Sequence, residues 1–389
     1  MVHDCPNCLA ALKYNPVSGK MECNSCGGSF AIDRYKKPAA EKKAMAPKSR
    51  TEKDADAESD TMQYRIYTCS ACDAELAVNK VETSTFCSYC GRPTIVFDRI
   101  ADVKKPEYII PFSISKEQAV ELIRKRFEKG AYVPKEIREF EIERVRGIYI
   151  PFRLYDVGYA DKQYLKYSGA YYYREAETNF HNVPMDASKQ LDNELAWRLL
   201  PYHNDGLRFF DSSYMSGFYA DCQDVCDEEL EPAVREHCKV MFEEEVKKHV
   251  LNKESKTTAL VDVVKSSPDV KVLNSAYAMF PAWFLTFRYK EEVYTIVVNG
   301  QTGKVVGAIP FEKEKAAAKF VITGILLSAL LVVVVYYFRF MLGMNVMLLI
   351  IGIIYWWDGV RTLKKMKKEV SRMTSSKITK LVKDRQEEK

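Results

Sequence analysis

The sequence lacks the motifs that identify the common classes of enzyme. None of its serines lies in a G-x-S-x-G nucleophile elbow. Residues 300–305 (GQTGKV) superficially resemble a phosphate-binding loop, but they lack the G-x-x-x-x-G-K-[ST] spacing and fall between two expected strands. We therefore expect no enzyme activity, no catalytic or cofactor-binding residue and no small-molecule substrate. An unrecognised active site within residues 101–310 is the alternative.

Charge is nearly absent between residues 320 and 357, where Arg339 is the only charged side chain. A bilayer core about 30 Å thick needs roughly 20 apolar residues of helix, so this stretch is long enough for two transmembrane helices with Arg339 at the turn. Lysines and arginines at 313–319 and 361–368 predict that both flanks are cytoplasmic. We therefore expect two spans in the cell membrane. A pair of buried helices in a soluble bundle is the alternative.

The beginning of the chain has no apolar segment of the signal-peptide type, because Met1–Cys5 leads directly into a cysteine motif. We therefore expect the N-terminus and the bulk of the chain to lie in the cytoplasm. Thiols stay reduced in that compartment, so the 11 cysteines are expected to be metal ligands or buried thiols rather than disulfides.

Eight cysteines form two matching quartets, in each of which fourteen residues separate two C-x-x-C pairs. Two such turns present four thiolates to one ion and leave no open coordination position, which is the arrangement of a structural zinc site. The sequence therefore predicts an internal repeat of two zinc ribbons that hold two structural Zn²⁺ ions. The expected ligands are Cys5, Cys8, Cys23 and Cys26 in the first ribbon and Cys69, Cys72, Cys87 and Cys90 in the second.

Other uses of the cysteines are weaker. A redox pair would need a thioredoxin-like context, which the sequence does not show, and the compartment disfavours a disulfide. A third metal site would need Cys222, Cys226, His237 and Cys238 to converge, whereas small buried thiols are the commoner outcome for such residues.

Residues 36–62 lack any recurring apolar position, so they are expected to form a disordered linker that lets the first ribbon move relative to the rest. The fold class is expected to be α+β with antiparallel strands. The expected organisation is zinc ribbon 1 at 1–35, the linker at 36–62, zinc ribbon 2 at 63–100, a cytoplasmic α+β domain at 101–310, two transmembrane helices at 320–357 and a basic amphipathic cytoplasmic tail at 358–389.

Within the α+β domain, Ser115–Gln118 form a capping box that begins an amphipathic helix. Residues 147–155 (GIYIPFRLY) and 279–289 (MFPAWFLTFRY) are rich in β-branched and aromatic residues, and each places a proline in a similar setting. They are therefore expected to be strands of two related β units. Further expected elements are helices at 192–200 and 224–250 and a closing hairpin at 293–309.

Four other motifs accompany the two quartets: YIIPF at 108–112, GIYIPF at 147–152, YMSGFYAD at 214–221 and VNGQTGKVVG at 298–307. With them the sequence resembles a family of bacterial membrane-anchored proteins of the Firmicutes type, whose N-terminal zinc ribbon is similar to that of transcription factor IIB. The resemblance covers most of the chain. It implies this architecture but no activity.

The expected function is therefore that of a membrane-anchored adaptor or sensor that binds another protein, with lipid contacted by the hairpin and the basic tail. The alternative is a membrane-tethered nucleic-acid-binding protein that uses its ribbons. Charge disfavours the alternative, because phosphate contacts need clustered lysines and arginines. Residues 1–35 and 63–100 each have zero net charge, and residues 101–310 have 29 basic and 33 acidic residues, a net charge of −4.

Overall fold

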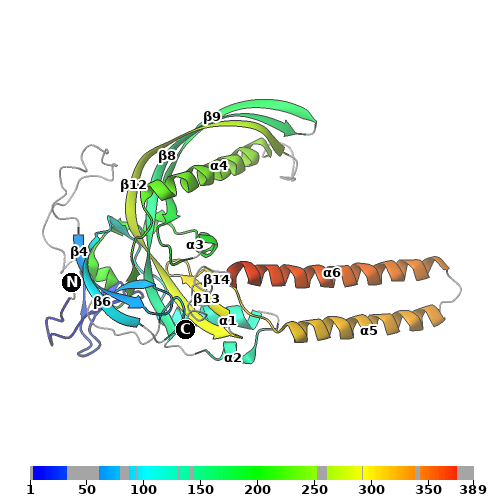
Figure 1. The fold of residues 1–389 in the computed structure, drawn as a ribbon, viewed down its shortest axis with the longest axis horizontal. Helices are drawn as coiled ribbons and strands as arrows, with labels where there is room; N and C mark the ends of the chain where they lie inside the picture. Colours follow the sequence, from blue (N-terminus) through cyan, green and yellow to red (C-terminus); the bar gives the residue numbers. More distant parts are fainter. Residues whose placement is uncertain are drawn as a thin grey trace.

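The computed structural model of the chain describes residues 3–32, 61–78, 87–92, 95–129, 132–140, 144–167, 169–191, 193–251, 261–290, 292–337 and 342–374. These residues form a mixed α+β body with a long curved arm. Two helices project side by side from the body (Figure 1). The α+β class is confirmed. The expected linker at 36–62 lies outside the described residues except for its last two positions, and residues 375–389 of the expected tail also lie outside them.

The main sheet has eleven strands and contains both parallel and antiparallel pairs. Its principal path runs β10-β7-β12-β8-β11-β5-β4-β6, with β9 beside β8 and the β13–β14 hairpin beside β12. The strands are β4 (Thr61–Cys69), β5 (Glu75–Val78), β6 (Ile95–Lys104), β7 (Tyr108–Ile109), β8 (Val145–Tyr167), β9 (Ala170–Asp186), β10 (Arg208–Phe209), β11 (Tyr219–Asp221), β12 (Val261–Tyr289), β13 (Glu292–Asn299) and β14 (Val305–Gly307).

The two proline-containing strands that the sequence predicts pair with each other. Strand β8 runs antiparallel to β12, with Pro151 opposite Met279 and Pro281 opposite Tyr149. Strands β8 and β12 each pair with further strands on their other side. Beside Pro151 the further neighbour of β8 changes from β11 to β9, and beside Pro281 the further neighbour of β12 changes from β7 to β13. A proline cannot donate to a ladder. It therefore fits where one neighbouring strand ends and the next begins.

Away from the two prolines, β8, β9 and β12 continue as a three-stranded curved arm. Helix α4 (Asp227–Leu251) lies along the inner side of this arm (Figure 1). A separate core of buried side chains joins the helix to the arm. At the base, the buried guanidinium of Arg153 donates to the carboxylate of Asp227, the first residue of α4. The helix that the sequence predicts at 224–250 is thus confirmed, and it braces the arm.

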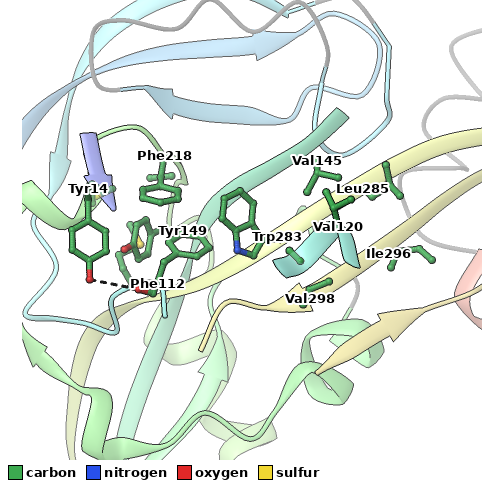
Figure 2. Packing of buried hydrophobic residues seen from close by; sticks show 14 of the residues in the cluster. Tyr14, Phe112, Val120, Val145, Tyr149, Phe218, Trp283, Leu285, Ile296 and Val298 are labelled. Carbon is green, nitrogen blue, oxygen red and sulfur yellow. Dashed lines mark hydrogen bonds between the residues drawn. The ribbon is translucent and has the colours of Figure 1, made fainter. Parts of the chain in front are cut away.

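The core of the body is built around stacked aromatic rings (Figure 2). Phe112 stacks on Phe218 with ring centroids 4.2 Å apart and meets Tyr149 edge to face at 5.0 Å. Trp283 packs against the same ring and donates its indole N–H to the carbonyl of Ile114 at 2.9 Å. The motifs YIIPF, GIYIPF and YMSGFYAD each supply one of these rings, so their aromatic residues serve packing.

The remaining helices of the body are short. The capping box of α1 (Lys116–Lys129) is confirmed. The side chain of Gln118 accepts from the backbone N–H of Ser115 at 2.8 Å, and the backbone N–H of Gln118 donates to the Ser115 hydroxyl. The others are α2 (Lys135–Arg138), α3 (Asn193–Leu199) and the 3₁₀ turns η4 (Asn204–Gly206) and η5 (Ser212–Met215).

The first cysteine unit has a three-stranded sheet of its own, formed by β1 (Lys13–Asn15), β2 (Lys20–Glu22) and β3 (Ser29–Phe30). It does not stand apart from the body. The backbone N–H of Tyr14 donates to the carbonyl of Ser216 at 3.0 Å, and its hydroxyl donates to the carbonyl of Phe112 at 3.5 Å (Figure 2). The expectation that this unit moves freely is therefore wrong, because its first strand is hydrogen-bonded to the body and shares its core.

The second cysteine unit is continuous with the main sheet. Strand β5 pairs with β4 on one side and with β11 of the body on the other. The boundary expected at residue 100 falls inside β6, which runs from Ile95 to Lys104. The expected division at 63–100 therefore needs correction, since backbone hydrogen bonds cross it.

Two antiparallel helices, α5 (Lys313–Tyr337) and α6 (Leu342–Thr374), project from the body (Figure 1). Within the described residues, one segment is long and apolar enough to cross a membrane, Glu314–Val334 in α5, and most of its side chains are exposed. Helix α6 continues without a break from the expected membrane segment into the expected tail at Asp358. The two-span hairpin is thus not confirmed; within the described residues there is one C-terminal helix that is long and apolar enough to span a membrane.

Candidate metal centres

The four C-x-x-C turns have the same backbone geometry. In each, the backbone N–H of the residue after the second cysteine donates to the carbonyl of the first cysteine at 2.8–2.9 Å. The backbone N–H of the first cysteine donates to the carbonyl of the residue five positions later. The residue after the second cysteine has a positive φ, which glycine adopts without strain. These residues are Leu9, Gly27, Asp73 and Gly91.

Each quartet brings four thiols within ligand distance of one point. The sulfur atoms of Cys5 and Cys26 are 3.5 Å apart and those of Cys8 and Cys23 are 3.4 Å apart. In the second group the corresponding distances are 3.6 Å and 3.7 Å, and within either group all four sulfurs lie within 4.8 Å of one another. Four sulfurs at 2.3 Å from a zinc ion would lie about 3.8 Å apart at the corners of a tetrahedron. Both groups can therefore hold a metal ion, as the sequence predicts.

The two groups differ in their exposure to solvent. All four cysteines of the second group are buried, whereas Cys8 and Cys26 of the first group are exposed. In the first group, the backbone N–H of Cys26 donates to the sulfur of Cys23 and lowers the pKa of that thiol to about 6. In the second, hydrogen bonds among the neighbouring thiols raise the pKa of Cys72. A cation removes the repulsion among four clustered thiolates, so its binding releases protons.

The residues between Cys87 and Cys90 anchor the second group to the body. Tyr89 is fully buried and its hydroxyl donates to the carboxylate of Asp221, on β11, at 2.7 Å. The hydroxyl of Thr286, on β12, donates to the carbonyl of Ser88 at 2.5 Å. Burial raises the pKa of Asp221 to about 7. Sequence patterns do not connect Tyr89 with Asp221, because only the fold brings them together across 132 residues.

Two arginines of the body line a small cavity beside this centre. Arg144 and Arg146 face Cys87, Ser88 and Thr286 around a volume of about 10 Å³, enough for about one water molecule. The Nε atom of Arg146 is buried and has no hydrogen-bond partner among the described residues. A zinc ion with four thiolates carries a net charge of −2, so these guanidinium groups would offset the charge of the loaded site.

The four residues considered for a third metal site do not converge. Cys238 is buried in the core between α4 and the arm, and His237 packs edge to face against Trp197 with ring centroids 4.0 Å apart. Cys226 is exposed and donates to Glu229 at 3.5 Å. Among the described residues, the two quartets are the groups of cysteine, histidine or carboxylate side chains placed to hold a metal ion.

The loop that superficially resembles a phosphate-binding loop is the turn of the β13–β14 hairpin. Its polar side chains hold the neighbouring segment in place. Asn299 donates to the carbonyls of Leu199 and Pro201, and Gln301 both accepts from and donates to the backbone of His203. The ammonium of Lys304 donates to the carbonyl of Leu200 at 2.5 Å. These side chains therefore act in packing between the hairpin and α3.

Comparison with known proteins agrees with the resemblance to Firmicutes proteins of unknown function. The chain is similar to the uncharacterized protein YdjG of Bacillus subtilis (strain 168), with 29% identity over 335 residues that span 82% of this chain and 92% of that protein. No family model matches the chain, and no solved structure does. This similarity brings no activity with it, since the relative is itself uncharacterized.

Proposed function

We propose that this protein is a membrane-anchored, cytoplasmic zinc protein that acts as an adaptor or sensor for another protein, without catalysis. The two four-cysteine groups would be zinc-ribbon sites, each with one structural Zn²⁺ ion. The observation that carries the proposal is the closed set of four sulfurs in each group, which leaves a bound ion no coordination position for a substrate. The second group is also built into the main sheet, as expected of a structural metal.

We further propose that α5 and α6 both cross the cell membrane, with both ends of the chain in the cytoplasm. The two helices are antiparallel neighbours, and the ring of Phe320 lies beside Gly359. The apolar part of α5 thus begins at the level where the apolar part of α6 ends. Trp356 and Trp357 are exposed at that level, where tryptophan side chains are favoured at a membrane–water interface.

The first cysteine unit offers a surface for a protein partner. Leu9 is 79% exposed and Val17 is 71% exposed, each in a turn of this small unit. The unit is held to the body through Tyr14 and through contacts of His3 with the hydroxyls of Ser212 and Ser213. Its turns are thus presented in a fixed orientation. We propose that Leu9 and Val17 contribute apolar contacts to the partner.

The test is to crosslink the full-length protein in its native membrane, purify it with and without nuclease, and identify what remains attached. We expect a defined protein partner that survives nuclease. The double variant Leu9→Asn with Val17→Asn should capture about tenfold less of it, because two apolar contacts are lost. Asparagine tolerates the positive φ of residue 9, so the turn is preserved.

The matched control is Ile100→Asn, which also replaces an exposed apolar side chain but lies on β6. This variant should retain the partner, and all three proteins should retain the same zinc content. Nucleic acid that is lost on nuclease treatment, with no protein left attached, would contradict the adaptor function and support nucleic-acid binding.

A further inference from the structure

The free end of the arm carries a group of tyrosines that the proposed function does not use. Tyr171 is 65% exposed, and Tyr172, Tyr173 and Tyr164 are also exposed. They lie next to the turn between β8 and β9, where Tyr164 pairs with Tyr173 and Leu165 pairs with Tyr172. Side chains alternate between the two faces of a strand. Tyr171 and Tyr173 therefore share one face of the arm tip and Tyr172 lies on the other.

The arm bends toward the side of the body from which α5 and α6 project (Figure 1). Measured along the direction of α5, the free end of the arm reaches the level of the first turns of α5 (Figure 1). The apolar part of α5 begins there, at Phe320. If α5 crosses a membrane, the arm tip lies at the level of the lipid headgroups on the same side.

The chemistry of the tip matches that location. Tyrosine combines an apolar ring with a polar hydroxyl and is enriched where a membrane meets water. Residues 160–177 contain three basic and three acidic side chains, so the tip has no net charge. Lys162 is paired with Glu175 at 3.0 Å, and the ammonium of Lys166 lies 5.7 Å from the centroid of the Tyr171 ring. Such a surface would contact lipid through its rings and hydroxyls and would not depend on anionic headgroups.

We propose that the tip of the β8–β9 hairpin rests in the headgroup layer of the membrane, with Tyr171, Tyr172 and Tyr173 as its contacts with lipid. This inference rests on the proposed membrane span of α5. The arm would then be a second point of contact with the bilayer beside α5. With both contacts made, the body is held at a fixed tilt, and the first cysteine unit faces a defined direction.

The test places a photoreactive benzophenone amino acid at one of three positions of the full-length protein in phosphatidylcholine nanodiscs. The first position is Tyr171. The second is Leu273, which is 59% exposed on β12 of the same arm and lies about 35 Å from the tip along the strands. The third is Ile325, exposed within the candidate span of α5. After irradiation, lipid adducts are measured by mass spectrometry.

We expect lipid adducts at Ile325 and at Tyr171, with the yield at Tyr171 severalfold above that at Leu273. Adducts at Ile325 with none above the Leu273 level at Tyr171 would overturn the tip contact and leave the membrane anchor intact. The absence of adducts at Ile325 would overturn the anchor itself. The same probe at Tyr171 in native membranes should yield lipid adducts; protein adducts in their place would make the tip a protein-binding surface and contradict the inference.

Discussion

Replacing Cys87 with serine is expected to remove the second metal ion and to unfold the sheet around it. A structural zinc site contributes on the order of 10 kcal/mol to folding, which is comparable to the whole stability of a typical domain. The lost ligand lies next to Tyr89 and Ser88, which join the unit to Asp221 and Thr286. Strand β5 links β4 and β6 to β11, so its loss detaches that part of the sheet.

The measurements are zinc content, thermal unfolding and limited proteolysis of the full-length protein. We expect one zinc ion per chain, loss of the cooperative transition of the body and new cleavage between residues 61 and 104. Membrane insertion should be unchanged, because α5 contains none of these residues. A Cys87→Ser protein that loses its metal yet unfolds at the wild-type temperature would show that this centre does not stabilise the body.

The matched control is Cys8→Ser, which removes a ligand of the first centre. Cys8 is exposed and belongs to a unit that, among the described residues, has a three-stranded sheet of its own, formed by β1, β2 and β3. The metal content should again fall to one ion, but the cooperative transition of the body should remain. The contrast between the two variants separates loss of metal as such from loss of the sheet that the metal supports.

Replacing Asp227 with alanine is expected to destabilise the arm by about 3 kcal/mol, because it leaves a buried guanidinium without its counter-charge. The side chain of Arg153 is 5% exposed, and its Nε donates to Asp227 at 2.7 Å. The hydroxyl of Tyr155 donates to the same carboxylate at 2.7 Å. The carboxylate is itself 36% exposed, so the lower end of the usual range for a broken buried pair applies.

Denaturant unfolding and hydrogen exchange across α4 would measure this effect. Glu231→Ala is the control on the same helix, since its ion pair with Arg235 is exposed and should be worth about 0.5 kcal/mol or less. Adding Arg153→Met to Asp227→Ala should recover most of the lost stability by removing the buried charge. An Asp227→Ala protein as stable as Glu231→Ala would contradict the role assigned to this contact.

Features that depend on local spacing could be predicted from the sequence. The four C-x-x-C turns, the capping box at Ser115 and the helix at 224–250 each depend on residues within a few turns of one another, and the structure places all of them as expected. The similarity between residues 147–155 and 279–289 predicted two related strands. It did not predict that these strands pair with each other, because no local rule fixes register across more than a hundred residues.

What the sequence missed is where the units dock. The hydrogen bonds of Tyr14 to Ser216 and Phe112, and the pairing of β5 with β11, join segments far apart in the chain. The composition of residues 36–62 favoured a first unit that moves relative to the rest. Composition carries no information about which distant strand a segment pairs with or which distant core an aromatic ring enters. These non-local contacts decide that both cysteine units are parts of the body.

The most direct test of the account is the metal content and sulfur coordination of the full-length protein, purified without added metal. Elemental analysis should find two zinc ions per chain, and X-ray absorption should show four sulfur ligands for each at about 2.3 Å. One ion or none, or an oxygen or nitrogen ligand at either zinc, would contradict the account, because the site would then be incomplete or open to a substrate.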